Sequence, residues 1–234
     1  MNTAFLHSIY GKIWALLSIL ALNAFVFNPW TKFPYTFVIL IAAVLLISYG
    51  QYNRLTELGF HSRYSLPKVL LIAVGLFLVV EPFVDFVLQP FTNWITNSPP
   101  DYGGFEILKG NTQMYQKYLL YTWISAAFGE EILYRGFLFQ QLAILLPQSK
   151  YTLPLTVLLS SVLFAVPHLY MGWSGVAFTF CFGVLIGLIY IRFHYNLWIT
   201  ILLHGLVDTL FITLAYTGRL EYYEWVSRWW THLF

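Results

Sequence analysis

The chain has 234 residues, of which 59% are hydrophobic and 9% are charged, far below the roughly 25% charged residues of an average soluble domain. A mean hydropathy of +0.69 excludes a soluble globule, and a net charge of +2 leaves no basic surface for nucleic acid. The single cysteine excludes a disulfide scaffold, and the continuous apolar runs exclude a transmembrane β-barrel. The composition predicts an all-α protein: a polytopic membrane bundle of about seven transmembrane helices plus interfacial segments.

Charged residues divide the first part of the chain into apolar stretches near the ~20 residues that a membrane span needs. The intervals from Lys12 to Lys32 and from Lys32 to Arg54 hold 19 and 21 uncharged residues, and each predicts a span. We interpret the first as a retained helix and not a signal peptide, because no small-residue cleavage site follows it. The polar stretch 51–68 reads as an interfacial loop, and a third span is expected over 68–89.

The third span is unusual because it contains Glu81, Pro82 and Asp85. These two acidic groups are most simply explained as structural groups at an irregular, hydrated helix end. The Pro/Gly/Asn-rich stretch 92–111 predicts an external loop. A fourth helix is expected over 116–146, and at up to ~30 residues it is longer than a straight span requires, which indicates that it is tilted, broken or protruding.

The last part of the chain predicts three more spans and a tail. No residue is charged over the 41 positions from Tyr151 to Ile191, which suffices for two spans separated by a loop at 167–175. A seventh span is expected over 197–215, and the tail mixes tryptophans with charged residues in the manner of an interfacial helix.

These elements give a domain plan and a membrane orientation. We interpret 1–114 as N-terminal transmembrane helices with an external loop, 115–216 as a helical core, for which the motifs described below imply a catalytic role, and 217–234 as the interfacial tail. Seven spans place the two termini on opposite sides of the cell membrane. The three basic residues of the 51–68 loop favour a cytoplasmic N-terminus.

Ionisable residues inside the predicted spans carry the functional signal, because such groups cost at least a few kcal/mol and persist only when paired, hydrated or used. Glu131 and Arg135 are four residues apart, which predicts an ion pair on one helix face. Glu130 points about 100° away from Glu131 and stays free for chemistry. The other members of the set are His168, His204 and Asp208.

This set suits the activation of a water molecule. A carboxylate in a confined apolar site acts as general base, and a histidine can share the water. A second histidine, His204, oriented by Asp208 one turn away, can stabilise an oxyanion. Glu130, His168, His204 and Asp208 are also suitable ligands for zinc, so a metal site stays open, as do purely structural roles for each pair.

Other proteolytic signatures are absent or misplaced. No His-Glu-x-x-His sequence occurs, which excludes the common zincin arrangement. The segment 172–175 fits the Gly-x-Ser-Gly pattern of rhomboid serine proteases. We reject that reading because Ser174 and His204 are expected at different membrane depths.

Three short motifs resemble those of the CPBP family of intramembrane endopeptidases, which includes the type II CAAX prenyl proteases. Segment 130–135 resembles its Glu-Glu-x-x-x-Arg motif, 164–168 its Phe-x-x-x-His motif and 204–208 its final His-x-x-x-Asn/Asp motif. The resemblance implies a helical membrane core whose site opens toward the cytoplasm. It also implies the following roles: Glu130 activates the water, His168 assists it, Glu131 and Arg135 support the helix together with Phe164, and His204 with Asp208 forms an oxyanion or metal site.

The resemblance further implies a peptide substrate or a prenylated or otherwise lipidated protein, in contact with the lipid bilayer. Two other functions stay open. One is a non-proteolytic membrane adaptor or immunity protein of the same fold. The other is a proton-coupled transporter, because intramembrane Glu, His and Asp also build proton relays. The lack of an internal repeat and of paired interrupted helices disfavours transport.

Overall fold

The computed structural model describes residue 6 and residues 8–231, and no strand occurs among them. Its α-helices are α2 (Ile9–Val26), α3 (Tyr35–Tyr52), α4 (Leu66–Phe83), α5 (Gln89–Thr96), α6 (Thr112–Tyr121), α7 (Leu138–Leu145), α8 (Thr152–Ala165), α9 (Gly172–Arg192), α10 (Leu197–Tyr216) and α11 (Glu221–Thr231). Three 3₁₀ segments are η1 (Thr56–Leu58), η3 (Gly103–Leu108) and η6 (Val166–Met171). Three π-helical segments are η2 (Val84–Leu88), η4 (Thr122–Glu130) and η5 (Ile132–Phe137). The all-helical bundle is confirmed.

Five described segments are long and apolar enough to cross a membrane. They are Ile9–Val26, Tyr35–Tyr52, Leu66–Thr96, Thr152–Arg192 and Leu197–Tyr216. The fourth folds back at η6, so that α8 and α9 pack against each other as a hairpin. The helix over 112–145 is not among the five, since four charged residues interrupt its apolar sequence. The expected count of seven spans is therefore not confirmed.

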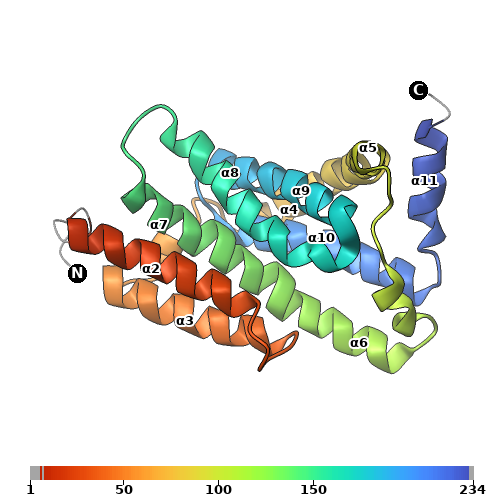
Figure 1. The fold of residues 1–234 in the computed structure, drawn as a ribbon, viewed down its shortest axis with the longest axis horizontal. Coiled ribbons are helices and arrows are strands. Elements are labelled where there is room, and N and C mark those ends of the chain that lie inside the picture. Colours follow the sequence, from red (N-terminus) through yellow and green to blue (C-terminus); the bar gives the residue numbers. More distant parts are fainter. Residues whose placement is uncertain (1–5, 7, 232–234) are drawn as a thin grey trace.

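The helix predicted over 116–146 is present as one long rod of α6, η4, η5 and α7, and Figure 1 shows it running through the length of the molecule. Asn111 caps its start by accepting a hydrogen bond from the Met114 N–H at 3.1 Å. Wide π-helical turns occupy most of its middle, and turns of this kind often occur at functional sites. The rod packs against α3 and α10 through η4 and against α2 and α8 through α7.

The third predicted span ends later than the sequence indicates. Instead of a span over 68–89 and a loop from 92, the helix continues through η2 and α5 to Thr96. Pro82 and Pro90 each lack the N–H that an α-helix needs, and the wide turn of η2 lies between them, so the prolines distort the helix without ending it. The external loop is correspondingly shorter and spans 97–111.

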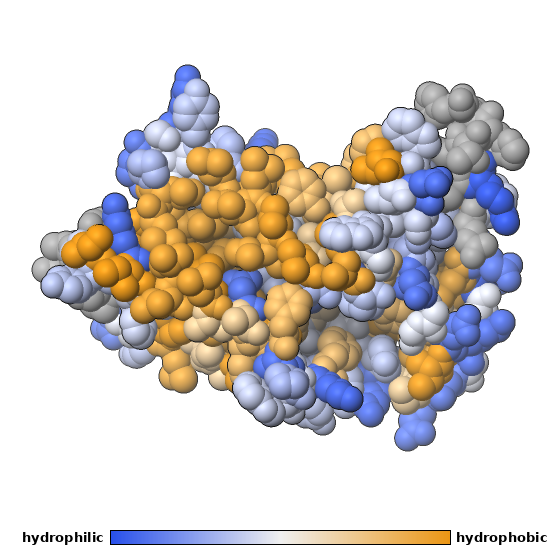
Figure 2. Space-filling view, in the orientation of Figure 1, coloured by the Kyte–Doolittle hydropathy of each residue, from blue (hydrophilic) through white to orange (hydrophobic). Residues whose placement is uncertain are grey.

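The surface has the distribution that a bilayer requires. A broad apolar band covers the middle of the molecule in Figure 2, with polar residues gathered toward its two ends. Large aliphatic side chains on this surface are open: Leu46, Leu71 and Val79 are 74%, 73% and 70% exposed. An apolar area of this extent is unfavourable in water and favourable against lipid chains, which supports a multi-pass membrane protein.

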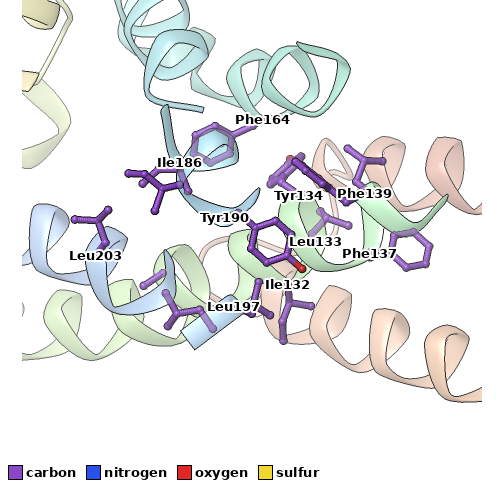
Figure 3. Close-up of a cluster of buried hydrophobic side chains, with 14 of the residues drawn as sticks. Ile132, Leu133, Tyr134, Phe137, Phe139, Phe164, Ile186, Tyr190, Leu197 and Leu203 are labelled. Atoms are coloured by element: carbon purple, nitrogen blue, oxygen red, sulfur yellow. The ribbon is translucent and has the colours of Figure 1, made fainter. Parts of the chain in front are cut away.

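The core of the bundle lies where the rod meets α8, α9 and α10, and Figure 3 shows its side chains converging between these helices. Its fully buried members include Ile132, Leu133, Phe164, Ile186, Tyr190 and Leu203. Two glycines, one in α10 and one in α9, allow these helices to pack closely against the rod and α8. A Cβ on Gly205 would lie 2.6 Å from Trp123 Cζ3, and one on Gly183 would lie 3.0 Å from Phe164 Cδ1. These contacts fix α10 and α9 against the rod and α8.

The fold predicts that two exposed loops lie on opposite sides of the membrane: 97–111 at one end of the molecule and the α7–α8 connection at the other. In a Cys181→Ala background, Ser98→Cys and Ser149→Cys are expected to react with a membrane-impermeant maleimide from opposite sides. With a cytoplasmic N-terminus, only Ser98→Cys is labelled in intact cells, and Ser149→Cys is labelled after permeabilisation. Labelling of both cysteines from one side would contradict the bundle topology.

Candidate active site

A cavity of about 530 Å³ lies between the rod, η6, α10 and the α4–η2 helix. All four residues expected to carry the chemistry line it: Glu130, His168, His204 and Asp208. They come from three separate segments of the chain, so the fold gathers groups that lie up to 78 positions apart. Phe164, the first residue of the second motif, lines the same cavity.

The predicted ion pair between Glu131 and Arg135 is present. Arg135 Nη1 donates to Glu131 Oε1 at 2.9 Å, and the two side chains are 1% and 0% exposed. Arg135 also donates from Nη2 to the Gly183 carbonyl at 3.4 Å, and its guanidinium carbon lies 4.2 Å from the centre of the Phe164 ring. A buried charge is stable only when partners surround it, and these contacts of Arg135 also link the rod to α8 and α9.

His204 has a closer partner than the one the sequence indicated. Its Nδ1 donates to Glu131 Oε1 at 3.0 Å, whereas its Nε2 lies 3.5 Å from Asp208 Oδ2 without a hydrogen bond. The spacing of four residues does bring Asp208 beside the ring, but Glu131 is the group that orients it. The pairing with Glu131 spans 73 positions and rests on the packing of α10 against the rod.

His168 is oriented by the backbone. Its Nδ1 lies 3.0 Å from the Phe164 carbonyl oxygen, and since a carbonyl only accepts, Nδ1 carries the proton. In the neutral ring, Nε2 is then an acceptor. Pro167 lies in the first turn of η6, where α8 gives way to a 3₁₀ segment, and this change of helix directs His168 into the cavity.

Glu130 differs from its neighbour in having no hydrogen-bond partner among the described side chains. It ends the π-helical segment η4, lines the cavity and is only partly buried. One carboxylate of the pair is therefore fixed by Arg135 and His204, and the other is free to meet a water or a substrate. This is the division of roles that the adjacent positions predict.

Residues 113–210 match the family model described as type II CAAX prenyl endopeptidase Rce1-like. This segment is Rce1-like. The match includes all six ionisable site residues and Phe164, and it confirms the resemblance drawn from the three motifs. The matched family is a family of proteases, which supports a hydrolase. No curated protein and no solved structure matches the chain.

Metal ligation has no support from the geometry of the Rce1-like segment. Among the described residues, no group of three or more His, Cys, Asp or Glu side chains is placed to hold a metal ion. The expected zinc ligands share one cavity without converging on one point. Zinc binding stays a prediction, and the metal content of purified protein tests it.

Ser174 has a structural role. It is buried, and its hydroxyl donates to Asn93 Oδ1 at 2.7 Å, which joins α9 to α5. No contact joins it to His204 among the described residues. This supports the rejection of a serine nucleophile in the Gly-x-Ser-Gly segment.

The cavity extends from the Rce1-like residues toward the end of the molecule that carries the 97–111 loop and α11, since Tyr102, Phe105 and Tyr223 also line it. That end lies opposite the basic 51–68 loop. With a cytoplasmic N-terminus, this end of the cavity would lie toward the non-cytoplasmic side, and the membrane orientation stays a prediction. Sequence reasoning also missed the phenols of Tyr102 and Tyr170 as cavity residues, and no spacing pattern identifies them.

Proposed function

We propose that the protein is an intramembrane endopeptidase in which a water activated by Glu130 hydrolyses a peptide bond. One observation carries the proposal: Glu130 presents a carboxylate without a protein partner to a cavity that it shares with two histidines of opposite hydrogen-bonding character. Glu131, the adjacent carboxylate, is held by Arg135 and His204 through Oε1, is not among the residues that line the cavity, and does not compete for this role.

In the first step, Glu130 takes a proton from the water while the water oxygen attacks the carbonyl carbon of the scissile bond. Nε2 of neutral His168 accepts a hydrogen bond from the same water and helps to hold it in place. The carbonyl π electrons move to the oxygen, which becomes an oxyanion. Both groups are acceptors, which is what the orientation of a water nucleophile requires.

His204 is placed to stabilise that oxyanion. Carboxylate oxygens lie near both of its ring nitrogens, at 3.0 Å from Nδ1 and 3.5 Å from Nε2. These oxygens favour a proton on each nitrogen, so the ring acts as a hydrogen-bond donor. A donor aimed at developing negative charge lowers the barrier without reorganisation. In the second step the oxyanion collapses, the C–N bond breaks, and the proton held by Glu130 passes to the leaving amine.

The rest of the cavity suits an apolar substrate. Aromatic side chains from α3, α6 and α9 and from the residue that follows α2 line it, among them Phe37, Tyr118, Phe178 and Phe27. These walls fit the apolar side chains of a peptide or a prenyl group, and the type II CAAX description of the matched family favours a prenylated protein. Specificity for a prenyl group is part of the proposal.

Proteomics of protein termini tests the activity in cells. Cells with the wild type are compared with cells that carry Glu130→Ala at equal abundance. We expect a set of termini, generated at or near the membrane surface, to be lost in the variant. Identical termini would favour an adaptor of the same fold.

Transport is disfavoured by the packing, because fully buried Leu133, Phe137 and Leu197 fill the bundle beside the Glu131–Arg135 pair.

Substitution of Asp208 is expected to reduce the rate of cleavage less than substitution of Glu130 does. Because Glu131 already orients His204, Asp208→Asn keeps the ring in place and removes only a charge 3.5 Å from Nε2. We expect kcat/KM to fall by about tenfold, or roughly 1.4 kcal/mol in the barrier, with unchanged folding. The pH–rate profiles of both proteins provide the measurement, with Asp101→Asn in the loop as control. Equal rates at every pH would remove Asp208 from the catalytic site.

A further inference from the structure

The cavity has a second acidic region, away from the motifs. Glu81 at the end of α4 and Asp85 in η2 are one helical turn apart, and both line the cavity. Asp85 is only 3% exposed, and its Oδ2 has no hydrogen-bond partner in the described part of the chain. A buried carboxylate oxygen without a donor is costly, and its place in a cavity wall points to a ligand that supplies the missing contact.

Phenol groups face this carboxylate from two other elements. Burial, together with the negative charge of Asp85, raises the pKa of Tyr102 in the loop and of Tyr223 in α11 above the ordinary value. Both phenols therefore stay neutral, and neither supplies a positive charge. Within the protein, Asp85 makes side-chain hydrogen bonds with Glu81 and with Tyr222 of α11, and neither of these partners is a cation. The Tyr102 hydroxyl already donates to Gln89 Oε1 at 3.0 Å.

Among the described residues that line the cavity, no lysine or arginine is present to neutralise the pair. Among the residues that line it are four acidic ones, and none is Lys or Arg. Two of the four, Glu130 and Asp208, lie with the histidines, which leaves Glu81 and Asp85 without a cation. A cleft wall that carries one sign of charge concentrates ligands of the opposite sign.

We propose that Glu81 and Asp85 form a subsite for a cationic group of the peptide substrate: a lysine ammonium, an arginine guanidinium or a free amino terminus. The subsite rests on the proposed function, in which a peptide occupies the cavity. It would select substrates that combine an apolar segment with a positive charge.

An organic cation fits the surroundings better than a metal ion does. No third His, Cys, Asp or Glu completes a ligand set here. The rings of Tyr102 and Tyr223 lie 5.5 Å apart and border the cavity beside the carboxyl pair. Aromatic faces attract ammonium and guanidinium groups, whereas a small metal ion requires further oxygen ligands.

Cleavage of matched peptides tests the subsite. The probes are fluorogenic peptides of one sequence that carry Lys, norleucine or Glu at each position around the scissile bond. At one position we expect Lys to be preferred over norleucine, and Asp85→Asn and Glu81→Gln to lower kcat/KM for the Lys peptide by at least about tenfold, through KM. The norleucine peptide should be cleaved equally by all variants. Glu106→Gln, an exposed acid at the same end, is the control.

Binding separates this proposal from the proposed function. The same peptides are titrated against Glu130→Gln protein, with and without Asp85→Asn. If the Lys peptide binds more tightly and Asp85→Asn removes the preference, the subsite stands even when no peptide is cleaved. Cleavage without any charge preference overturns the subsite and leaves the peptidase intact. If Asp85→Asn fails to fold, Glu81→Gln decides alone. Saturation by Mg²⁺ with no preference among peptides also overturns the subsite.

Discussion

Glu130→Gln is expected to abolish peptide cleavage while the amount and the thermal stability of the folded protein stay unchanged. Glutamine has the same shape and cannot take a proton from water, and Glu130 has no hydrogen-bond partner among the described side chains whose loss would destabilise the bundle. General-base catalysis contributes typically ~10²–10⁴-fold, so the rate should fall by at least that range.

The measurement is cleavage of a fluorogenic peptide by detergent-purified protein, beside thermal unfolding of the same samples. The matched control is Glu106→Gln, which makes the same change at an exposed acid outside the cavity. Equal rates for Glu130→Gln and wild type would remove the general-base role. A loss of folded protein would instead show that Glu130 has a structural role.

Glu131→Gln is expected to lower both folded yield and activity. The carboxylate accepts hydrogen bonds from Arg135 and His204 through one oxygen. Glutamine at this position leaves the Arg135 charge buried without a counter-charge. Removing one partner of a buried pair costs about 3–5 kcal/mol. His204 also loses the group that orients it, so the folded fraction should be less active per molecule.

A double-mutant cycle identifies the cause. Arg135→Gln alone should also destabilise, and Glu131→Gln with Arg135→Gln should cost less than the sum of the two, because no unpaired charge remains. Thermal unfolding in detergent measures all four proteins. Strict additivity would contradict a direct interaction, and a stable Glu131→Gln protein would show that the pair contributes little to folding.

Contacts within one helix were predictable because they depend only on spacing. The ion pair of Glu131 with Arg135 and the proximity of His204 to Asp208 both follow from positions four residues apart. The membrane class and the long rod followed from composition and apolar length. Four ionisable residues singled out in the apolar helices do line one cavity, because such groups in a membrane bundle have few structural explanations.

Contacts between helices were not predictable in the same way. The hydrogen bond from His204 to Glu131 depends on where α10 packs along the rod, and the close approach at Gly205 that permits it has no signature in a single sequence. The continuation of the third helix past two prolines was missed because a π-helical segment replaces the expected break. The sequence favours a structural role for Asp85, and its place in the cavity wall, with Oδ2 lacking a hydrogen-bond partner, depends on packing between helices that spacing does not reveal.

One oxygen atom, Glu131 Oε1, receives hydrogen bonds from both Arg135 and His204, and Arg135 in turn holds the Gly183 carbonyl. The geometry of the site is thereby tied to the docking of two helices that come late in the chain. Until α9 and α10 have packed against the rod, Arg135 lacks the Gly183 carbonyl and Glu131 lacks the His204 ring. Under the proposed mechanism, a chain in which these two helices have not yet docked does not hydrolyse peptides.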